Sequence, residues 1–338
     1  MGSRAALKTT ASATLALALA AFCPGAAAAA EWRAPRTPDG RPDLGGAWAN
    51  ATLTPFERQK DFKDLAVPEA EALAYDRKWV GIVRQEKDPV GQADTEWPET
   101  GDGLTRVRDV ARSSWIVQPA DGKIPWTAKA RAWNKVQGEA METRFDHPEE
   151  RPLAERCLWS RQAGPPLRSG PDLSVHLFVQ TADHLAIVTE ANPMPRIVRL
   201  GGTHQPGVRP WMGDSIGRWD GETLVVETVG PHPLQSRGPD GDAGATHKVT
   251  ERFTRTGPDE LHYAFTVENP ALYAQRWQGE TVMKRSKGPL YEYACHEGNY
   301  GLENILRGGR VAEAEAKAQA QADAGGKAPA GGAAPAAP

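Results

Sequence analysis

Apolar positions recur along the chain with two different periods. Between residues 54 and 90 they follow helical spacing after Pro68, which suits the first turn of a helix. Residues 127–143 repeat this pattern with Trp133 facing inward, and residues 302–323, rich in Ala and Glu, continue as a third segment. The pattern predicts two or three peripheral helices.

From about residue 173 to residue 295 the period is two, which is typical of half-buried strands. The dipeptide Asp220-Gly221 between two such runs is a strong hairpin signal. Consecutive strands joined by tight turns pair antiparallel, so we expect a mainly β fold: an antiparallel meander, a sandwich, or a closed barrel without exposed edges. The expected strands are 44–48, 114–117, 172–180, 184–190, 195–200, 211–219, 223–229, 247–255, 260–268, 275–284 and 289–294.

The two ends of the chain differ from this middle part. Residues 1–30 combine basic residues, a short apolar stretch and an Ala-rich end, which predict a secretory signal cleaved near Ala30 and a periplasmic or secreted product. Lipidation at Cys23 is an alternative, against which the bulky Phe22 argues. Residues 31–310 are expected to form one β-rich domain with a helical N-terminal part. Residues 311–338 are expected to form an Ala/Gly/Pro-rich tail, helical and then disordered.

Composition narrows the classes of partner. The 338 residues carry a formal charge of −3 without a basic block, which argues against nucleic acid. After the signal, no apolar run approaches the roughly 18 residues of a transmembrane segment. The 28 Pro and 34 Gly favour many turns, and the 11 Trp favour a pocket that stacks against rings. We therefore expect a small-molecule ligand or substrate, with no preference for an oligomeric state.

Two cysteines remain after the signal, Cys157 and Cys295. In an oxidising compartment two thiols usually pair, so we expect a disulfide, with a free reactive thiol as the alternative. Two cysteines are too few for a thiolate zinc cage. The eight histidines stand singly, so their spacing predicts no metal or other cofactor. Convergence of His204, His247 and His296 on a metal is the alternative.

One expected strand carries charge on its apolar face. His247, Val249, Glu251 and Phe253 share one parity, so Glu251 lies among apolar side chains. A carboxylate there costs several kcal/mol unless it is paired or faces a wet cavity. Glu251 is therefore either half of a buried pair with an arginine or part of a cavity wall.

Two further segments concentrate polar groups. Residues 210–219 place Asp214 between glycines and two tryptophans, either in a bulged strand whose Asp holds backbone amides or in a site. Residues 295–300 put His296 and Glu297 beside the expected disulfide. They are either a preorganised acid–base pair or part of a polar loop that caps the last helix.

Longer phrases carry a resemblance to a known family. They are PDGRPDL at 38–44, IVQPADGKIP at 116–125, ERCL at 155–158, WMGDS at 211–215, WDGETLVVET at 219–228 and YEYACHEGNYG at 291–301. Over about residues 35–310 the chain resembles a family of exported bacterial proteins for which no reaction is established. The resemblance implies secretion and a single β-rich domain, and it implies no catalytic residues. Gly46-Ala47-Trp48 is similar to the G-x-W start of lipocalin-type barrels, which implies a calycin/lipocalin-like barrel.

The first functional hypothesis is an exported, cofactor-independent acid–base enzyme: a lyase, an isomerase or cyclase, or a hydrolase. It would act on a small, partly apolar, ring-containing substrate in a Trp-lined pocket. The expected catalytic residues are Asp214, Glu251, His204, His296 and Glu297, with a carboxylate as base and His296 as acid. The expected substrate-binding residues are Trp211, Arg196, Trp219, Asn299, Tyr300, Glu190 and His247.

Two alternatives require no catalysis. A periplasmic lipocalin-like binding protein would use the same pocket without a matched acid and base. A non-catalytic envelope interaction protein would need no pocket.

Overall fold

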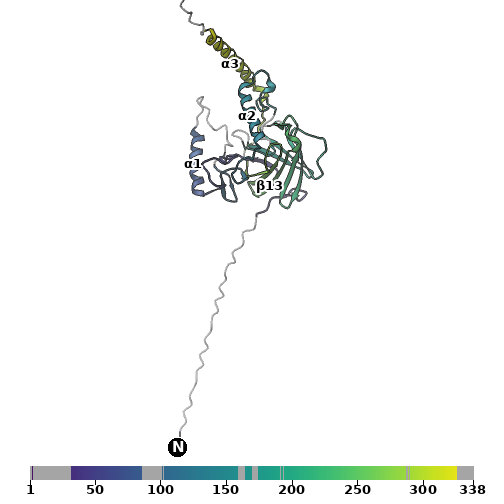
Figure 1. Cartoon of the computed structure of the whole chain (residues 1–338). Helices are drawn as coiled ribbons and strands as arrows, with labels where there is room; N and C mark the ends of the chain where they lie inside the picture. Colours follow the sequence, from purple (N-terminus) through teal and green to yellow (C-terminus); the bar gives the residue numbers. More distant parts are fainter. Residues whose placement is uncertain are drawn as a thin grey trace, which may run out of the picture. The chain divides into compact units, whose positions relative to one another are not determined.

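Nine strands close into a barrel (Figure 1). The structure is a computed structural model that describes Gly2 and residues 32–85, 101, 103–158, 164–169, 174–190, 192, 194–286, 288 and 290–325. Around the barrel the strands are β1 (Gly46–Ala49), β6 (Val175–Gln180), β7 (His184–Thr189), β8 (Arg196–Leu200), β9 (Asp214–Asp220), β10 (Thr223–Val229), β13 (Lys248–Gly257), β14 (Glu260–Glu268) and β15 (Trp277–Arg285). Pairing of Trp48 with Arg285 and of Ala49 with Lys284 joins β1 to β15. The expectation of a mainly β fold is confirmed, and its form is the closed barrel.

Neighbouring barrel strands pair antiparallel, as expected, except that β8 and β9 run parallel with Val198 opposite Ser215. A parallel pair needs a connection that returns to the starting end, and residues 201–213 provide it. A further strand, β5 (Ile116–Gln118), pairs with β15 beside the closed circle. The strand expected at 289–294 is wrong for residues 290–294, which are irregular. Because β15 already pairs with β14, β1 and β5, the barrel offers this segment no free edge.

Smaller elements surround the barrel. A three-stranded sheet has the order β2 (Ala66–Val67), β4 (Val110–Arg112), β3 (Arg106–Val107), and β11 (Arg237–Gly238) pairs with β12 (Gly241–Asp242). The α-helices are α1 (Glu69–Gln85), α2 (Ala128–Thr143) and α3 (Tyr300–Gly325), and short 3-10 helices are η2 (Pro148–Glu150), η4 (Ala243–Thr246) and η5 (His296–Gly298). The expected helices are confirmed within these bounds, although the first begins only after Pro68.

Two helices rest on small apolar cores of their own. Ala72 of α1 packs with Phe62, Val67, Leu104 and Ala111. The second helix, α2, contacts Ala243 and Leu272 through Ala130, and the hydroxyl of its N-cap Thr127 accepts the N–H of Ala130.

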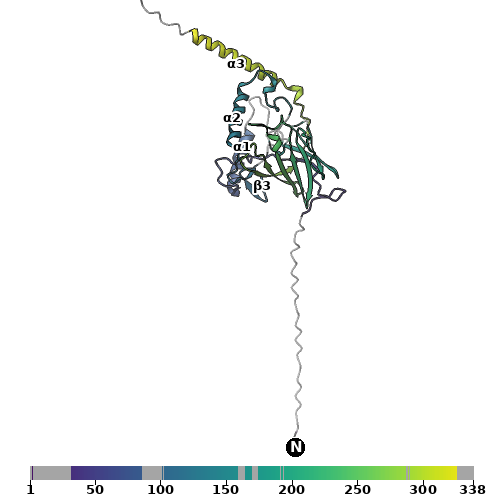
Figure 2. The same cartoon turned by 45° about the vertical axis from the view of Figure 1, so that its right-hand side comes forward.

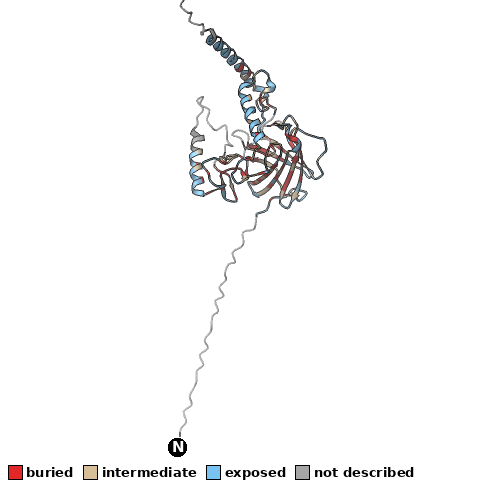
Figure 3. Cartoon of the chain, viewed as in Figure 1, coloured by how far each residue is buried: buried red, intermediate tan, exposed pale blue. Residues whose placement is uncertain are grey.

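The third helix, α3, is yellow in Figure 2, and beyond Leu306 nearly all of its described side chains are exposed (Figure 3). In the described part of the chain, no helix combines the length and the apolar character that a membrane crossing requires.

Large side chains fill the barrel interior. Phe253 and Tyr263 stack with ring centroids 5.0 Å apart, Phe265 lies 5.5 Å from Tyr263, and Trp277 meets Phe265 edge-on at 5.7 Å. Gly279 makes room for these rings, since a Cβ there would run into Phe265. Trp277 is among the fully buried side chains, so it belongs to the packed core.

The Gly46-Ala47-Trp48 segment begins the barrel. Trp48 is fully buried, donates through Nε1 to the carbonyl of Leu44 at 2.8 Å, and lies under the guanidinium groups of Arg285 and Arg255, 4.4 and 5.6 Å from its ring. Gly46 has a φ of +117°, and a Cβ there would collide with Arg285. The glycine therefore lets an arginine of the last strand cover a tryptophan of the first.

The chain divides into two units, residues 1–32 and residues 33–338. The expected secretory signal falls in the first unit, where all residues but Gly2 and Trp32 lie outside the described residues. Of the expected tail, residues 326–338 also lie outside them, and the part before is helical as expected.

The disulfide between Cys157 and Cys295 is present. Asn299 donates through Nδ2 to the carbonyl of Glu155 at 2.9 Å and contacts Sγ of Cys157 at 3.3 Å. The bond and the amide together hold the segment before α3 against the segment that follows α2.

Loss of this disulfide should lower stability without changing the barrel. It joins residues 138 positions apart, so Cys157→Ser should cost roughly 4–5 kcal/mol on the chain-entropy model. Urea unfolding of the oxidised wild type and the variant measures the difference, and the reduced wild type serves as control. Equal midpoints for oxidised wild type and variant would contradict this expectation.

Candidate functional site

The barrel interior contains a cluster of polar side chains among its rings. Glu251 of β13 binds both guanidinium ends of Arg196 from β8, with Nη2 at 3.0 Å from Oε1. The hydroxyl of Tyr263 donates to Oε1 of Glu251 at 2.8 Å and accepts the N–H of Leu167 at 2.9 Å. We define the internal polar cluster as these side chains of Arg196, Glu251 and Tyr263 together with His176, Thr189, Ser215 and Thr228.

This geometry decides between the two interpretations of Glu251. Its exposed fraction is 0%, and Arg196 and Tyr263 bind its oxygens, so Glu251 is half of a buried ion pair with an arginine. Burial and then the charge of Glu251 raise the pKa of Tyr263 well above its usual value, so the phenol keeps its proton and keeps donating. The expected catalytic residue Glu251 and the expected substrate-binding residue Arg196 therefore bind each other.

His176 belongs to the same cluster and was not expected there. Burial, followed by the charge of Arg196, lowers the pKa of His176 to about 3, so the ring is neutral at pH 7. Its Nδ1 lies 2.9 Å from Oγ1 of Thr189, whereas its Nε2 has no hydrogen-bond partner among the described residues. A signal did exist, because His176 shares its strand face with Phe178.

A second network lies on the outer face of β8, β9 and β10. Nδ1 of His204 is 3.0 Å from Asp214 and Nε2 is 3.1 Å from Glu227, so both ring nitrogens are occupied. Arg199 binds Asp214 through two nitrogens, and Lys248 binds Glu227 at 2.6 Å.

Both carboxyls of this network are held ionised. Burial opposes the charge of Asp214, but hydrogen bonds from Arg199, the Gln205 amide and His204 together lower its pKa. A hydrogen bond from Lys248 lowers the pKa of Glu227 despite burial, and His204 adds to the effect. The structure therefore brings the expected residues His204 and Asp214 together, in an arrangement that leaves His204 no free nitrogen for a substrate.

The segment after the disulfide has a different setting. His296 and Glu297 are exposed in η5, and Tyr300 is 74% exposed. Oδ1 of Asn299 accepts the N–H of Leu302 at 3.2 Å and so caps the start of α3. Among the described residues no hydrogen bond or ion pair joins these side chains to the residues expected as their partners, Asp214 and Glu251.

The remaining expected residues lie apart from one another in local contacts. Trp211 stacks on His232 with centroids 5.1 Å apart, and Trp219 packs against the barrel core. Nδ1 of His247 contacts Asn269 at 3.3 Å, and Oε1 of Glu190 accepts the N–H of Tyr291. Within the described residues, no group of three or more His, Cys, Asp or Glu side chains is arranged to hold a metal ion.

A groove of about 600 Å³ lies outside the barrel wall, and none of the residues expected in the site lines it. Its wall is formed by outward-facing residues of β10, β13, β14 and β15, and the β3–β4 hairpin borders it. We define the outer groove by its lining residues: Arg106, Val107, Arg108, Asp109, Thr223, Arg252, Thr254, Thr256, Glu260, His262, Ala264, Val282 and Lys284.

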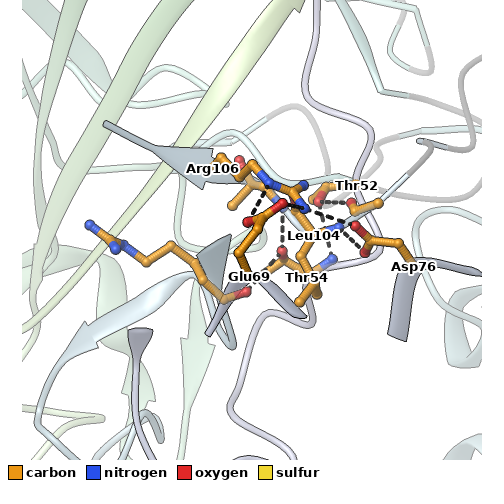
Figure 4. Close-up of polar contacts among 9 residues, drawn as sticks. Thr52, Thr54, Glu69, Asp76, Leu104 and Arg106 are labelled. Atoms are coloured by element: carbon orange, nitrogen blue, oxygen red, sulfur yellow. Dashed lines mark hydrogen bonds and ion pairs between the residues drawn. The ribbon is translucent and has the colours of Figure 1, made fainter. Parts of the chain in front are cut away.

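Contacts with α1 fix the hairpin in place (Figure 4). Asp76 accepts the N–H of Leu104 at 2.7 Å and a guanidinium N–H of Arg106 at 3.2 Å, and Glu69 binds Arg106 through both carboxylate oxygens. The hydroxyl of Thr54 accepts the N–H of Thr105 at 2.7 Å. The hairpin is thus anchored through the backbone that leads into β3 and through the side chain of Arg106.

The turn of this hairpin presents charge beside the groove. Arg108 and Asp109 form the two central positions with φ of +51° and +63°, where a residue other than Gly is uncommon. Both are exposed, and among the described residues neither side chain makes a hydrogen bond or ion pair. The three other arginine and lysine side chains of the groove have partners: Arg106 binds Glu69 and Asp76, Arg252 binds Asp220 at 2.9 Å, and Lys284 binds Glu260 at 2.6 Å.

His262 lies on the groove wall with a carboxylate next to it. Its Nε2 is 3.2 Å from Oε2 of Glu280, and Oε1 of Glu280 accepts the Nε–H of Arg112 at 2.9 Å. The hydrogen bond with His262, opposed by burial and supported by Arg112, lowers the pKa of Glu280. Sequence parity placed His262 opposite the apolar face of its strand and gave no sign of the hairpin beside it.

Comparisons of the chain with protein-family models, with curated proteins and with solved structures find no match.

Breaking the internal ion pair should be costly. Glu251→Gln leaves Arg196 buried without its counter-charge, so we expect the free energy of unfolding to fall by about 3–5 kcal/mol. Glu222→Gln, which breaks the exposed pair with Arg36, is the matched control and should cost less than about 1 kcal/mol. Urea unfolding measures both variants, and equal small losses would return Glu251 to the cavity-wall interpretation.

Stability should also fall as the pH drops below about 6.5. The unfolded chain then takes up a proton at His176 that the folded chain refuses until its pKa of about 3. The free energy of unfolding should therefore decrease by up to about 1.4 kcal/mol per pH unit from this residue between pH 6.5 and 5. His247, whose pKa burial lowers to about 4, acts in the same direction. Urea unfolding at several pH values should give a shallower slope for His176→Gln, and an unchanged slope would contradict the assignment.

Proposed function

We propose that the protein is a binding protein and that its outer groove takes a small anionic molecule. The observation that carries the proposal is the Arg108 guanidinium, an exposed cation without a partner among the described residues, on a hairpin that is fixed beside a groove of about 600 Å³. That volume lies within the range of small-molecule sites, roughly 300–1,000 Å³.

Charge favours an anion. Arg252 with Asp220, and Lys284 with Glu260, are exposed pairs whose side chains retain between a third and two thirds of their exposure. Such pairs contribute little to stability, so these cations are able to turn to a ligand at low cost. A guanidinium binds carboxylate or phosphate through two parallel N–H groups, a geometry that Arg108 and Arg252 both offer.

The lining also limits the rest of the ligand. Thr223, Thr254 and Thr256 supply hydroxyl groups, and Val107 and Val282 supply apolar surface. No Phe, Tyr or Trp is among the lining residues of the outer groove, so the expected stacking of a ring on tryptophan has no support here. The ligand that fits is small, anionic and partly hydroxylated rather than aromatic.

The barrel fold is compatible with a lipocalin-like binding protein, in which the ligand would lie inside the barrel. In this chain Phe253, Tyr263 and Phe265 occupy that interior, which is why the proposal places the ligand outside. Export belongs to the proposal as well, and the predicted signal and the disulfide support it.

Calorimetric titration with citrate, inorganic phosphate and glucose 6-phosphate tests the proposal. We expect at least one of these anions to bind the mature chain, and Arg108→Ala to weaken it about tenfold or more, because hydrogen bonds to charged groups contribute about 1.5–3 kcal/mol. Arg131→Ala removes an exposed arginine of α2 away from the groove and should leave the affinity unchanged. Absence of binding by all three anions, or equal affinities in both variants, would contradict the proposal.

A further inference from the structure

The outer groove contains an imidazole held in the arrangement of a general base. Glu280 is not among the groove-lining residues, whereas His262 is, so the carboxylate supports the ring from outside the groove. Glu280 stays ionised because its hydrogen bonds with His262 and Arg112 outweigh its burial. An ionised carboxylate only accepts hydrogen bonds, so Nε2 of His262 carries the proton.

The other ring nitrogen then has a free lone pair. No hydrogen bond to Nδ1 of His262 is formed by the described residues, and the side chain is 19% exposed. A ring oriented by a carboxylate at one nitrogen and open to a site at the other is the arrangement that general-base catalysis requires.

We propose that His262 is a general base for the hydrolysis of an anionic ester bound in the outer groove. The inference rests on the proposed function, because Arg108 would hold the anionic group of the ester. Hydrolysis is favoured over carbanion chemistry because the groove is open to water: Lys284 on its wall is 65% exposed.

The step balances with water as the co-reactant. Nδ1 of His262 accepts a proton from a water molecule, whose oxygen forms a bond to the acyl carbon of the ester. The bond between that carbon and the leaving oxygen then breaks, and the proton on Nδ1 passes to the leaving oxygen. The products are an acid and an alcohol, and Glu280 is a positioning residue that remains ionised throughout.

Other charged groups around His262 set its pH dependence. Glu280 contacts His262 directly, and Arg112 binds Glu280. Burial opposes the charge of Glu260 on the same strand, but hydrogen bonds from Lys284 and Thr256, with a smaller contribution from His262, lower its pKa. The remaining charged groups that line the groove are Arg106, Arg108, Asp109, Arg252 and Lys284. We expect the rate to depend on pH in a single step that is absent in a variant without His262.

The experiment uses the monomethyl ester of malic acid, a small, anionic and hydroxylated ester whose hydrolysis is followed by titrating the acid released at constant pH. We expect His262→Gln to lower turnover by about 100-fold or more, since general bases typically contribute 10²–10⁴-fold. Its affinity for the anion that binds in calorimetry should stay within about twofold of wild type. Glu280→Gln should keep part of the turnover and shift the pH profile, which a merely structural role would not do.

A histidine outside the groove provides a matched control variant. His184 also pairs with a carboxylate, Asp183 at 3.1 Å, but it is the first residue of β7 and does not line the groove. His184→Gln should leave turnover unchanged. Should His262→Gln fail to fold, modification of wild-type His262 by diethyl pyrocarbonate replaces it: loss of turnover in step with modification, and protection by the bound anion, support the inference.

The outcomes separate the inference from the proposed function. If the anion binds but turnover is equal in wild type, His262→Gln and His184→Gln, the general-base role of His262 is overturned and the proposed binding site remains. The same holds if the anion binds and no turnover is observed. Absence of anion binding overturns the proposed function, and the inference with it.

Discussion

Two residue pairs between β1 and β15 close the barrel, and this closure determines which surfaces of the protein remain for chemistry. The first strand contributes Trp48, and the last strand covers it with Arg285, so the seam is sealed by ladder hydrogen bonds and by a cation over a ring. Once closed, the barrel has no free edge, and its interior must satisfy every polar group it contains. That constraint explains why the interior polar groups pair with one another and why the candidate site lies on the outer face.

Inside, most of the polar side chains pair with one another, although Nε2 of His176 has no partner among the described residues. Glu251 has a bidentate arginine and a phenol, and His176 remains neutral in their field. A carboxylate bound in this way holds its surroundings in one arrangement and has little left for a ligand. Outside, the strands present threonines and opposite charges to water, and where the β3–β4 hairpin lies beside the wall they border a concave space. The candidate site therefore depends on the small sheet and α1 as much as on the barrel.

The sequence predicts the barrel strands well because alternation is a local property. Residues 223–229 and 260–268 are strands with the expected bounds, and the parity of Glu251 correctly revealed an unusual buried charge. Strand neighbours and ion-pair partners are not predicted in this way. Alternation states which face a residue occupies and not what lies opposite, so the parallel pairing of β8 with β9 and the choice of Arg196 as counter-ion could not be read from it.

The outer groove was missed for the same physical reason. Its residues come from four barrel strands and a hairpin whose strands have two and three residues, and most of them alone are ordinary polar or charged side chains. His262 belongs to a candidate site only because the pairing of β14 with β15 places it beside Glu280 and because the hairpin lies next to it. Both are contacts between distant parts of the chain. The segment after Cys295 is the opposite case, because its dense run of polar residues is conspicuous in the sequence. In the fold, Asn299 of this segment caps the start of α3.

The seam between β1 and β15 also bears on the order in which the chain folds. The two strands stand near opposite ends of the domain in sequence, so their pairing is among the most non-local contacts of the molecule. Such contacts require the entropy of a long loop to be lost before they yield stabilisation, which slows folding. For a chain that emerges from its N-terminus, β1 is exposed first and waits for nearly all of the domain before it acquires its second neighbour. Until then its backbone groups on that side are an open template for pairing with other chains, and the brevity of β1, four residues, limits that hazard.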